Sequence, residues 1–396
     1  MEKGLELRKV AVITGTRAEY GLLKPVIQKI IEDSDLELDL IVTGTHLSEE
    51  FGYTINDIVQ DKIPVTAKIK AYPLTDDGYA MAKAISRLLD KLIDELAQNR
   101  PDFILILGDR GEPLAAAIAG TYSNIPVAHI HGGEVSGSVD EPVRHAISKL
   151  AHIHLPATQS AAERLIKMGE SENRVFITGA PGLDSILHEN FLTRDALAEK
   201  IGLDPSKNFI VVLQHAVTTK YTPKESADQI KITLQAVARL NSQNVVIYPN
   251  SDAGGREMIQ EIEKIAKEPN FHVFKNLPSM LYRSLLKHAT LLIGNSSSGI
   301  IEAPSYNLPV INIGSRQNKR ERAGNVITVD YDEQEIYDLA TRILTDQKFR
   351  QSLEDVINPY GDGTAAEKIV EVLTAVEITP EFLQKTMTYS FHFLVF

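Results

Sequence analysis

Phe103-Ile-Leu-Ile-Leu-Gly-Asp-Arg110 is a short apolar run that ends abruptly in ionisable residues beside a glycine, and Ile125-Pro-Val-Ala-His-Ile-His-Gly-Gly-Glu134 repeats this pattern. Residues 112–121 between them have the length and composition of a crossover helix, which predicts two parallel strands. Ligands of open parallel sheets bind just beyond the carboxyl ends of the strands. We therefore expect Asp109, His131 and Glu134 to share a site. The alternative is that Asp109 caps the next helix and His131 merely continues a strand.

Strand-like runs and amphipathic helices alternate along almost the whole chain, which is typical of parallel α/β layers. The alternation starts with a strand at Val10–Thr14, pauses between Gly179 and Lys207, and starts again at Phe209–Leu213. We therefore predict an α/β protein of two Rossmann-like, doubly wound domains that face a central cleft. The expected limits are residues 1–185 for the N-terminal domain, 186–360 for the C-terminal domain, 361–376 for a last helix and 377–396 for a tail without an assigned role.

The composition excludes several classes of protein. The chain has 396 residues, 43% of them apolar, and can bury a large core. It has no cysteine, which excludes disulfides, iron–sulfur clusters and cysteine nucleophiles and favours a reducing, cytoplasmic location. No apolar run approaches the roughly 18 to 20 residues of a membrane span. A net charge of −12, with acidic and basic residues interspersed, argues against binding to nucleic acid. We expect neither a membrane nor nucleic acid as a partner.

Three further segments carry candidate binding residues. Arg17 follows the first strand in Thr14-Gly-Thr-Arg17, where a guanidinium suits a phosphate, although a surface arginine in a turn is the alternative. Gly294-Asn-Ser-Ser-Ser-Gly299 comes between a strand and a predicted helix near Ile300–Ser305, so its hydroxyl and N–H groups form either a diphosphate cradle or an ordinary helix cap. Glu302 suits ribose hydroxyls or is an exposed carboxylate. His215 either holds a phosphate or moves a proton, or it is a buried structural histidine.

Sequence motifs for cofactors are absent. No G-x-G-x-x-G follows a strand and no G-x-x-x-x-G-K-[ST] occurs, so neither a bound dinucleotide nor a P-loop nucleotide hydrolase is predicted. We expect the chemistry to proceed without a nicotinamide or any other cofactor. The histidines around His129 and His131 raise the alternative of a metal site. A catalytic zinc needs three convergent ligands and supporting residues behind them, and no such pattern is visible, so we predict no metal.

In combination and in order, the motifs of this chain resemble those of the hydrolysing UDP-N-acetylglucosamine 2-epimerases, from about Lys9 to about Leu373. They are Thr14-Gly-Thr-Arg-Ala-Glu-Tyr-Gly21, Gly108-Asp-Arg110, His129-Ile-His-Gly-Gly-Glu-Val-Ser-Gly137, Asp140-Glu-Pro-Val-Arg-His-Ala-Ile-Ser-Lys149, Gln214-His-Ala-Val-Thr-Thr219, Gly294–Glu302 and Gly314-Ser-Arg-Gln317. The resemblance implies the two-domain fold also seen in GT-B glycosyltransferases, with UDP gripped between the domains and residues 186–360 as the UDP-binding domain.

The resemblance also implies a reaction and roles for single residues. UDP is eliminated across C1–C2 of UDP-N-acetylglucosamine, and water adds to the glycal to release N-acetylmannosamine for nonulosonic (sialic) acid synthesis. By position, Asp109 and Asp140 match acidic residues of the proton chemistry, and His215 matches a histidine near the diphosphate. The positions that match contacts with UDP are Arg17, Ser296, Ser297, Glu302 and Arg316, together with His215.

One position departs from the family pattern. Members that make N-acetylmannosamine usually have His-Ile-Glu-Gly-Gly-Glu, so His131 stands in the place of a catalytic glutamate. Either His131 takes over as acid and base, or Glu134 supplies the carboxylate. A histidine here is similar to relatives that act on UDP-2,4-diacetamido-trideoxyhexoses of legionaminic-type pathways, which makes such a sugar the alternative substrate. A GT-B glycosyltransferase and a non-catalytic UDP-sugar sensor are the alternatives of other classes. We expect a homo-oligomer, either a dimer or a tetramer.

Overall fold

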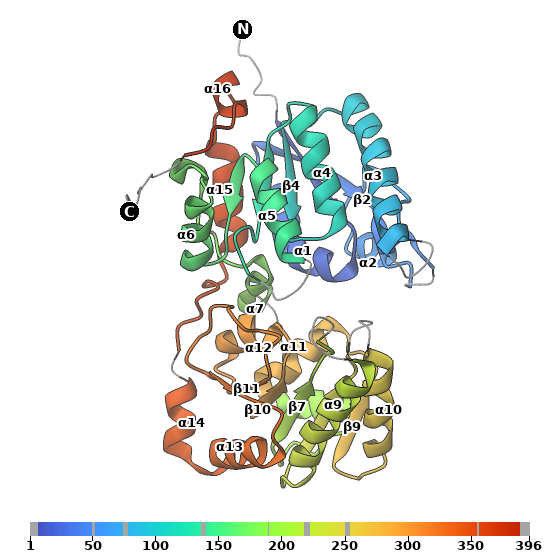
Figure 1. The fold of residues 1–396 in the computed structure, drawn as a ribbon, viewed down its shortest axis with the longest axis vertical. Coiled ribbons are helices and arrows are strands. Elements are labelled where there is room, and N and C mark those ends of the chain that lie inside the picture. Colours follow the sequence, from blue (N-terminus) through green and yellow to red (C-terminus); the bar gives the residue numbers. More distant parts are fainter. Residues whose placement is uncertain are drawn as a thin grey trace, which may run out of the picture. The chain divides into compact units, whose positions relative to one another are not determined.

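The computed structural model describes residues 7–49, 52–73, 78–135, 140–188, 190–217, 222–249, 254–354 and 356–388. The chain divides into two compact units, which are described separately. Unit 1 is formed by the described residues up to Ser185 together with those from Tyr360 onward, and unit 2 by Ile186–Pro359. The last helices of the chain therefore belong to the first unit (Figure 1).

Unit 1 is built on a six-stranded parallel sheet with the order β3-β2-β1-β4-β5-β6. Its strands are β1 (Arg8–Thr14), β2 (Leu36–Val42), β3 (Ala67–Lys68), β4 (Phe103–Leu107), β5 (Val127–Ile130) and β6 (Ile153–Leu155). Its helices are α1 (Arg17–Glu32), α2 (Ile55–Gln60), α3 (Gly78–Gln98), α4 (Gly111–Tyr122), α5 (Asp140–Leu150), α6 (Gln159–Lys167), α15 (Ala365–Ala375) and α16 (Pro380–Leu383). This strand order is that of a doubly wound dinucleotide-binding fold, and its topological switch lies between β1 and β4.

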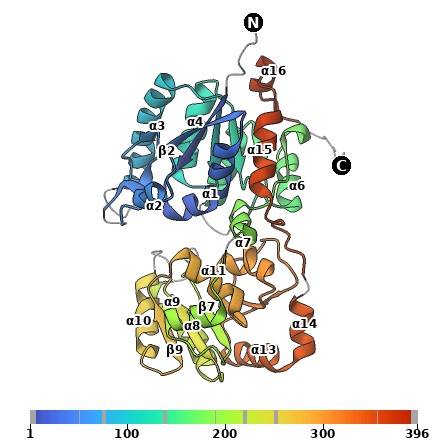
Figure 2. The same cartoon turned by 180° about the vertical axis from the view of Figure 1, so that it is seen from behind.

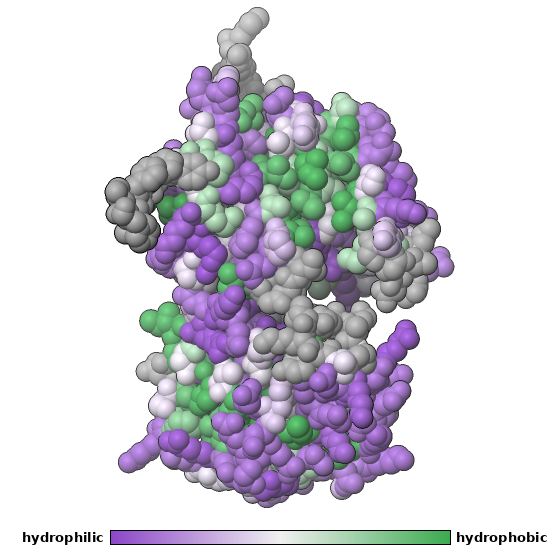
Figure 3. All heavy atoms as spheres, in the orientation of Figure 1, coloured by the Kyte–Doolittle hydropathy of each residue, from purple (hydrophilic) through white to green (hydrophobic). Residues whose placement is uncertain are grey.

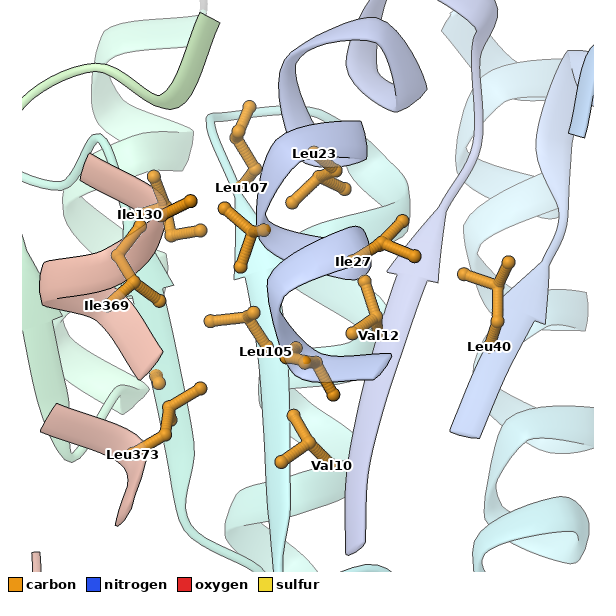
Figure 4. Close-up of a cluster of buried hydrophobic side chains, with 14 of the residues drawn as sticks. Val10, Val12, Leu23, Ile27, Leu40, Leu105, Leu107, Ile130, Ile369 and Leu373 are labelled. Carbon is orange, nitrogen blue, oxygen red and sulfur yellow. The ribbon is translucent and has the colours of Figure 1, made fainter. Parts of the chain in front are cut away.

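Both faces of the unit 1 sheet are covered because side chains alternate along each strand. Val10 and Val12 of β1 point toward α1 and α15 and pack in one cluster with Leu23, Ile27, Ile369 and Leu373 (Figure 4). Ala11 and Ile13 belong to a second cluster with the alanines of α4 and the leucines of α3. Figure 1 accordingly shows α3, α4 and α5 on one face, and Figure 2 shows α1 and α15 on the other.

Unit 2 repeats the arrangement with the order β12-β11-β10-β7-β8-β9, again all parallel. Its strands are β7 (Phe209–Leu213), β8 (Gln243–Ile247), β9 (Phe271–Phe274), β10 (Leu291–Gly294), β11 (Val310–Ile313) and β12 (Val326–Val329). Its helices are α8 (Arg194–Ile201), α9 (Pro223–Ala238), α10 (Gly255–Ile265), α11 (Ser279–His288), α12 (Ser298–Ile301), α13 (Glu333–Thr345) and α14 (Gln347–Glu354), and α7 (Asp184–His188) joins the two units. The topological switch of this sheet lies between β7 and β10.

The predicted class, two Rossmann-like doubly wound sheets, is confirmed, and one local element differs. The helix expected near Ile300–Ser305 is split into α12 and a 3₁₀ turn at Ala303–Tyr306. Pro304 lies in this turn and has no N–H, so the α-helical hydrogen-bond ladder cannot continue through it. None of the helices in the described ranges is both long and apolar enough to cross a bilayer.

Candidate active site

The loops that follow β4 and β5 lie beside each other at one edge of the unit 1 sheet. The two strands are parallel neighbours with Leu107 opposite Ile130, and the N–H of Gly108 donates to the carbonyl of Ile130 over 3.0 Å. Gly108 has a positive φ of 82°, which turns the chain sharply before Asp109. Asp109 is not the cap of α4, because the N-cap position belongs to Arg110 and has no side-chain hydrogen bond.

Arg144 of α5 joins Asp109 to the loop after β5. Its guanidinium forms a close ion pair with the carboxylate of Asp109, and its second nitrogen donates to the backbone carbonyl of Glu134 over 3.0 Å. The Arg144 side chain is only 5% exposed, whereas that of Asp109 is 22% exposed. The arginine is therefore held inside the protein while the carboxylate stays accessible. Arg144 lies within a quoted motif, but sequence reasoning gave it no role.

His131 and Glu134 form a buried pair. Nδ1 of His131 contacts Oε1 of Glu134, and the two side chains are 11% and 9% exposed. A carboxylate at Nδ1 places the imidazole proton there, which leaves Nε2 as the basic nitrogen. Within the described ranges, Nε2 of His131 is buried without a hydrogen-bond partner. The pair thus has the arrangement of a general base oriented by a carboxylate.

His131 also adopts an uncommon backbone conformation, with φ of +63°. A non-glycine residue in the left-handed region costs of order 1–3 kcal/mol, and such residues cluster at functional sites. The next turn is equally constrained, because a Cβ at Gly133 would lie 2.4 Å from the carbonyl oxygen of Ala161. His131 and Gly133 thus form a constrained turn directly after β5.

Two other histidines of unit 1, His129 and His152, have structural partners. Nε2 of His129 contacts the carbonyl of Gly108 at 2.7 Å, and its Nδ1 lies 3.3 Å from the hydroxyl of Ser148. Burial lowers the pKa of His129 to about 3, so the ring is neutral at physiological pH. Nδ1 of His152 accepts from the N–H of Val127 over 3.2 Å. Across the described parts of the chain, no group of three or more metal-ligating side chains converges.

Arg17 is the first residue of α1, directly after the loop that follows β1. Thr16 caps the helix, and the buried carboxyl group of Glu19 accepts from the N–H of Gly15 over 2.6 Å. Arg17 itself is half exposed and pairs with Asp57 at 3.0 Å, not with a predicted catalytic acid. Asp140 opens α5, but its side chain lies outside the part of the structure that is described.

Unit 2 presents a second cluster where β7 and β10 end side by side. Asn295 is fully buried and brackets the backbone of His215: its Oδ1 accepts from the N–H over 2.7 Å and its Nδ2 donates to the carbonyl over 2.9 Å. The carbonyl of Asn295 accepts from Arg316 and Gln317, at 3.2 and 2.9 Å. Burial, and then the charge of Arg316, lower the pKa of His215 to about 3. Thr218 and Thr219 of the same motif lie outside the described residues.

The serine segment after β10 forms a chain of hydroxyl groups. Oγ of Ser296 lies 3.0 Å from Oγ of Ser298, which lies 2.6 Å from the hydroxyl of Tyr282 in α11. Ser297 is the N-cap residue of α12 and makes no side-chain capping bond. Burial raises the pKa of Glu302 to about 7, and Arg283 opposes that rise. Tyr282 was not predicted, because it follows no strand and carries no motif.

The chain is similar to known proteins over most of its length. The family model described as UDP-N-acetylglucosamine 2-epimerase matches residues 28–374. A Legionella pneumophila protein named UDP-N,N'-diacetylbacillosamine 2-epimerase (hydrolyzing) is 40% identical over 97% of this chain and 100% of its own length. A Neisseria meningitidis protein named UDP-N-acetylglucosamine 2-epimerase is 36% identical over 94% of this chain and 96% of its own length.

The solved structures agree on the fold. The crystal structure of UDP-GlcNAc 2-epimerase from Neisseria meningitidis bound to UDP-GlcNAc superimposes with a TM-score of 0.80 at 21% identity, covering 92% of this chain and 99% of the other. The fold is therefore GT-B-like, in the sense of two Rossmann-like units in one chain. With a family model that spans most of its length and relatives of up to 40% identity that match end to end, the chain belongs to the UDP-N-acetylglucosamine 2-epimerase family.

Proposed function

We propose that this protein is a hydrolysing UDP-sugar 2-epimerase that eliminates UDP from its substrate and hydrates the resulting glycal to release the free 2-epimeric sugar. The observation that carries the proposal is the pair of His131 and Glu134 beside the ion pair of Asp109 and Arg144. The similarity to a relative whose name includes the hydrolysing reaction supports it over 97% of the chain.

The stereochemistry of the reaction requires two proton-transfer groups. The C2–H bond breaks as UDP departs with the electrons of the C1–O bond, and water then supplies a hydroxyl to C1 and a proton to C2. Because inversion returns the proton to the opposite face, one group removes it and another delivers it. Nε2 of His131 is oriented to accept a proton, and the carboxylate of Asp109 is the accessible second group. We assign Glu134 to orient His131, so both residues contribute to one acid/base unit.

UDP binding is assigned mainly to residues of unit 2. The hydroxyl groups of Ser296 and Ser297 and the guanidinium of Arg316 suit a diphosphate. A neutral His215 can donate one hydrogen bond to a phosphate oxygen without requiring a proton from solvent. Glu302 suits the ribose hydroxyls, as the family resemblance implies, and Arg17 supplies a further positive charge. Asp140 stays a candidate acid by its position in the motif.

The substrate that we favour is a UDP-2,4-diacetamido-trideoxyhexose of the diacetylbacillosamine type. The support is the 40% identical Legionella relative, a 36% identical Campylobacter jejuni relative with a similar name, and His131 at the position of the usual glutamate. UDP-N-acetylglucosamine, with N-acetylmannosamine as product, is the second candidate because of the Neisseria relative. A role in nonulosonic acid synthesis, a cytoplasmic location and a reaction without a nicotinamide stay predictions.

Incubation of the purified protein with each UDP-sugar alone tests reaction and substrate together. We expect UDP and the free 2-epimeric sugar from UDP-N,N'-diacetylbacillosamine, identified by NMR, and at least about tenfold less product from UDP-N-acetylglucosamine. The reverse ratio would make N-acetylmannosamine formation the function. Sugar transfer only when an acceptor is added would indicate a glycosyltransferase, and binding of UDP without turnover of either sugar would indicate a sensor.

We also propose that the protein is a homodimer joined through an apolar face of unit 1. Three neighbouring helices carry apolar side chains that are partly or largely exposed, and Figure 3 shows hydrophobic colouring over this part of unit 1. The face consists of Ile85, Leu89 and Ile93 of α3, Leu114, Ile118 and Tyr122 of α4, and Val143 and Leu150 of α5. The three residues of α3 and the three of α4 recur every four positions, so each set lies on one side of its helix.

A second copy is the occupant that fits the extent of this face. Three helices about 10 Å apart and about 18 Å long present of order 500 Å² in projection, which approaches the roughly 800 Å² per partner of a stable interface. Light scattering should give the mass of a dimer for the wild type and of a monomer for Ile118→Glu. The control is Ile357→Glu, which changes an isoleucine of unit 2 that is 92% exposed. A monomeric wild type, or a dimeric Ile118→Glu, would contradict the proposal.

A further inference from the structure

The segment that follows α15 lies on unit 1, and the proposed reaction gives it no role. The guanidinium of Arg174 lies 4.6 Å from the ring centroid of Phe382, which is also 6.1 Å from the ring of His152. The N–H of Thr388 donates to the carbonyl of Gly169 over 2.9 Å. These contacts fix the segment at both ends, and Lys385 lies between them.

Lys385 binds the carboxyl-terminal turn of α5. Its Nζ donates to the carbonyl oxygens of Ser148, Lys149 and Ala151, over 2.9, 2.9 and 2.7 Å. The last carbonyls of a helix have no partner within the helix and carry the negative end of its dipole. A largely buried ammonium from a distant part of the chain therefore satisfies acceptors whose loss would leave this turn free to fray.

Glu170 supplies the opposite charge that keeps this ammonium buried. Its carboxylate is fully buried and lies 2.6 Å from Nζ of Lys385, and it also pairs with Lys149 and His154, each at 2.9 Å. Burial by itself would raise the pKa of Glu170, but the hydrogen bonds from His154 and Lys385 hold it at about 2. Breaking such a network from one side leaves an uncompensated charge inside the protein.

Two residues of α5, Ser148 and Arg144, connect the turn that Lys385 binds to the site. The carbonyl of Ser148 accepts from Lys385 while its hydroxyl contacts Nδ1 of His129, and the same imidazole contacts the carbonyl of Gly108, directly before Asp109. One turn earlier in α5, Arg144 binds the carboxylate of Asp109 and the carbonyl of Glu134. A shift in the end of α5 would therefore move both of these supports.

We propose that Lys385 is a positioning residue: it fixes the end of α5 and thereby the geometry of Asp109 and of the loop that carries His131 and Glu134. The inference rests on the proposed function, because it concerns the groups that we assign to proton transfer. It also gives the end of the chain a role in a site formed more than two hundred residues earlier, although Lys385 itself touches none of the reacting groups.

The test compares Lys385→Met, which keeps the length of the side chain and removes its charge, with Lys385→Arg and a matched control. The control is Thr388→Val. Thr388 lies in the same segment as Lys385, and its hydroxyl contacts the carbonyls of Gly169 and Glu170, which lie outside α5. Each variant is examined by steady-state kinetics, by calorimetry with UDP, and by hydrogen–deuterium exchange of peptides from residues 140–152.

We expect Lys385→Met to lower kcat by about 10- to 100-fold, the usual effect of small misplacements of catalytic groups, while KM and the affinity for UDP change by less than about threefold. Exchange in the last turn of α5 should accelerate, Lys385→Arg should restore part of kcat, and Thr388→Val should match the wild type. Equal kinetics of Lys385→Met and Thr388→Val would overturn the inference, as would unchanged exchange in α5. A wild type that turns over neither UDP-sugar would refute the proposed function alone, since the exchange experiment still reports on the contact between Lys385 and α5.

Discussion

The stability of unit 1 should fall as the pH rises from 5 to 9, because Glu19 must lose a proton in a buried position. Burial, and then the charge of Glu112, raise the pKa of Glu19 from 4.5 to about 8, against the opposing effects of the Gly15 N–H and of Arg110. Between these two values the folded state binds a proton that the unfolded state has released. The stabilisation is therefore complete below about pH 4.5 and is lost as the pH rises through 8.

The magnitude follows from the two pKa values. At about 1.36 kcal/mol for each tenfold change in acidity, a pKa of about 8 in place of 4.5 corresponds to about 5 kcal/mol. About 4 kcal/mol of this falls between pH 5 and pH 9. In Glu19→Gln an amide oxygen still accepts from the N–H of Gly15, but no proton is exchanged, so this pH-dependent loss should disappear.

The assay is urea unfolding followed by circular dichroism at pH 5, 7 and 9, because the chain has no tryptophan. The quantity of interest is the difference in the free energy of unfolding between wild type and Glu19→Gln, in which the titration of all other groups cancels. Glu32→Gln is the matched control, since Glu32 lies on the same helix and is exposed. Parallel pH profiles of wild type and Glu19→Gln would refute the reasoning.

Three further outcomes test the site and its supports. Asp109→Asn should lower turnover by at least about two decades, measured as product formation, and leave the affinity for UDP unchanged in calorimetry. Arg17→Ala should weaken UDP binding by about 1.5–3 kcal/mol if a charge-assisted phosphate contact is lost, whereas Asp57→Asn should not weaken it. Asn295→Ala should destabilise unit 2 by about 2–5 kcal/mol in urea unfolding, because the backbone N–H and carbonyl of His215 both lose buried partners. A loss of stability below about 1 kcal/mol would contradict the structural role of these two hydrogen bonds.

The central strands β4 and β7 were predictable because each is apolar on both faces. In a sheet covered by helices on both sides, a central strand becomes a continuous apolar run, and the runs at Phe103–Leu107 and Phe209–Leu213 coincide with β4 and β7. The position of Asp109 and His131 beyond neighbouring strands followed from the same argument. A continuous apolar run indicates that both faces of a strand are buried, and in this fold helices cover both faces of the sheet.

Helix α5 was not predicted, and the reason is physical. The helix is short, and its buried face includes the polar residues Arg144 and Ser148 beside the apolar Ile147, so few of its positions carry the apolar repeat that signals a helix. The role of Lys385 could not be predicted either, because its partners are backbone carbonyls at the end of a helix that is far away in the sequence. The roles of such residues depend on contacts with distant parts of the chain, which the spacing of residues in the sequence does not reveal.

The sequence left His131 and Glu134 as alternative proton-transfer residues, and the structure shows that the two side chains form one pair. Three residues apart in a turn, the two side chains were competing candidates for one proton. The structure pairs them, and a carboxylate at Nδ1 holds the ring proton there, so that Nε2 is the nitrogen that can accept a proton. In this pair the atom that accepts a proton is Nε2 of His131, which lies on the opposite side of the imidazole ring from the carboxylate of Glu134. A substrate that fits such a site must leave room for that ring, so the exchange of glutamate for histidine bears on the sugar that is accepted as much as on the proton that is moved.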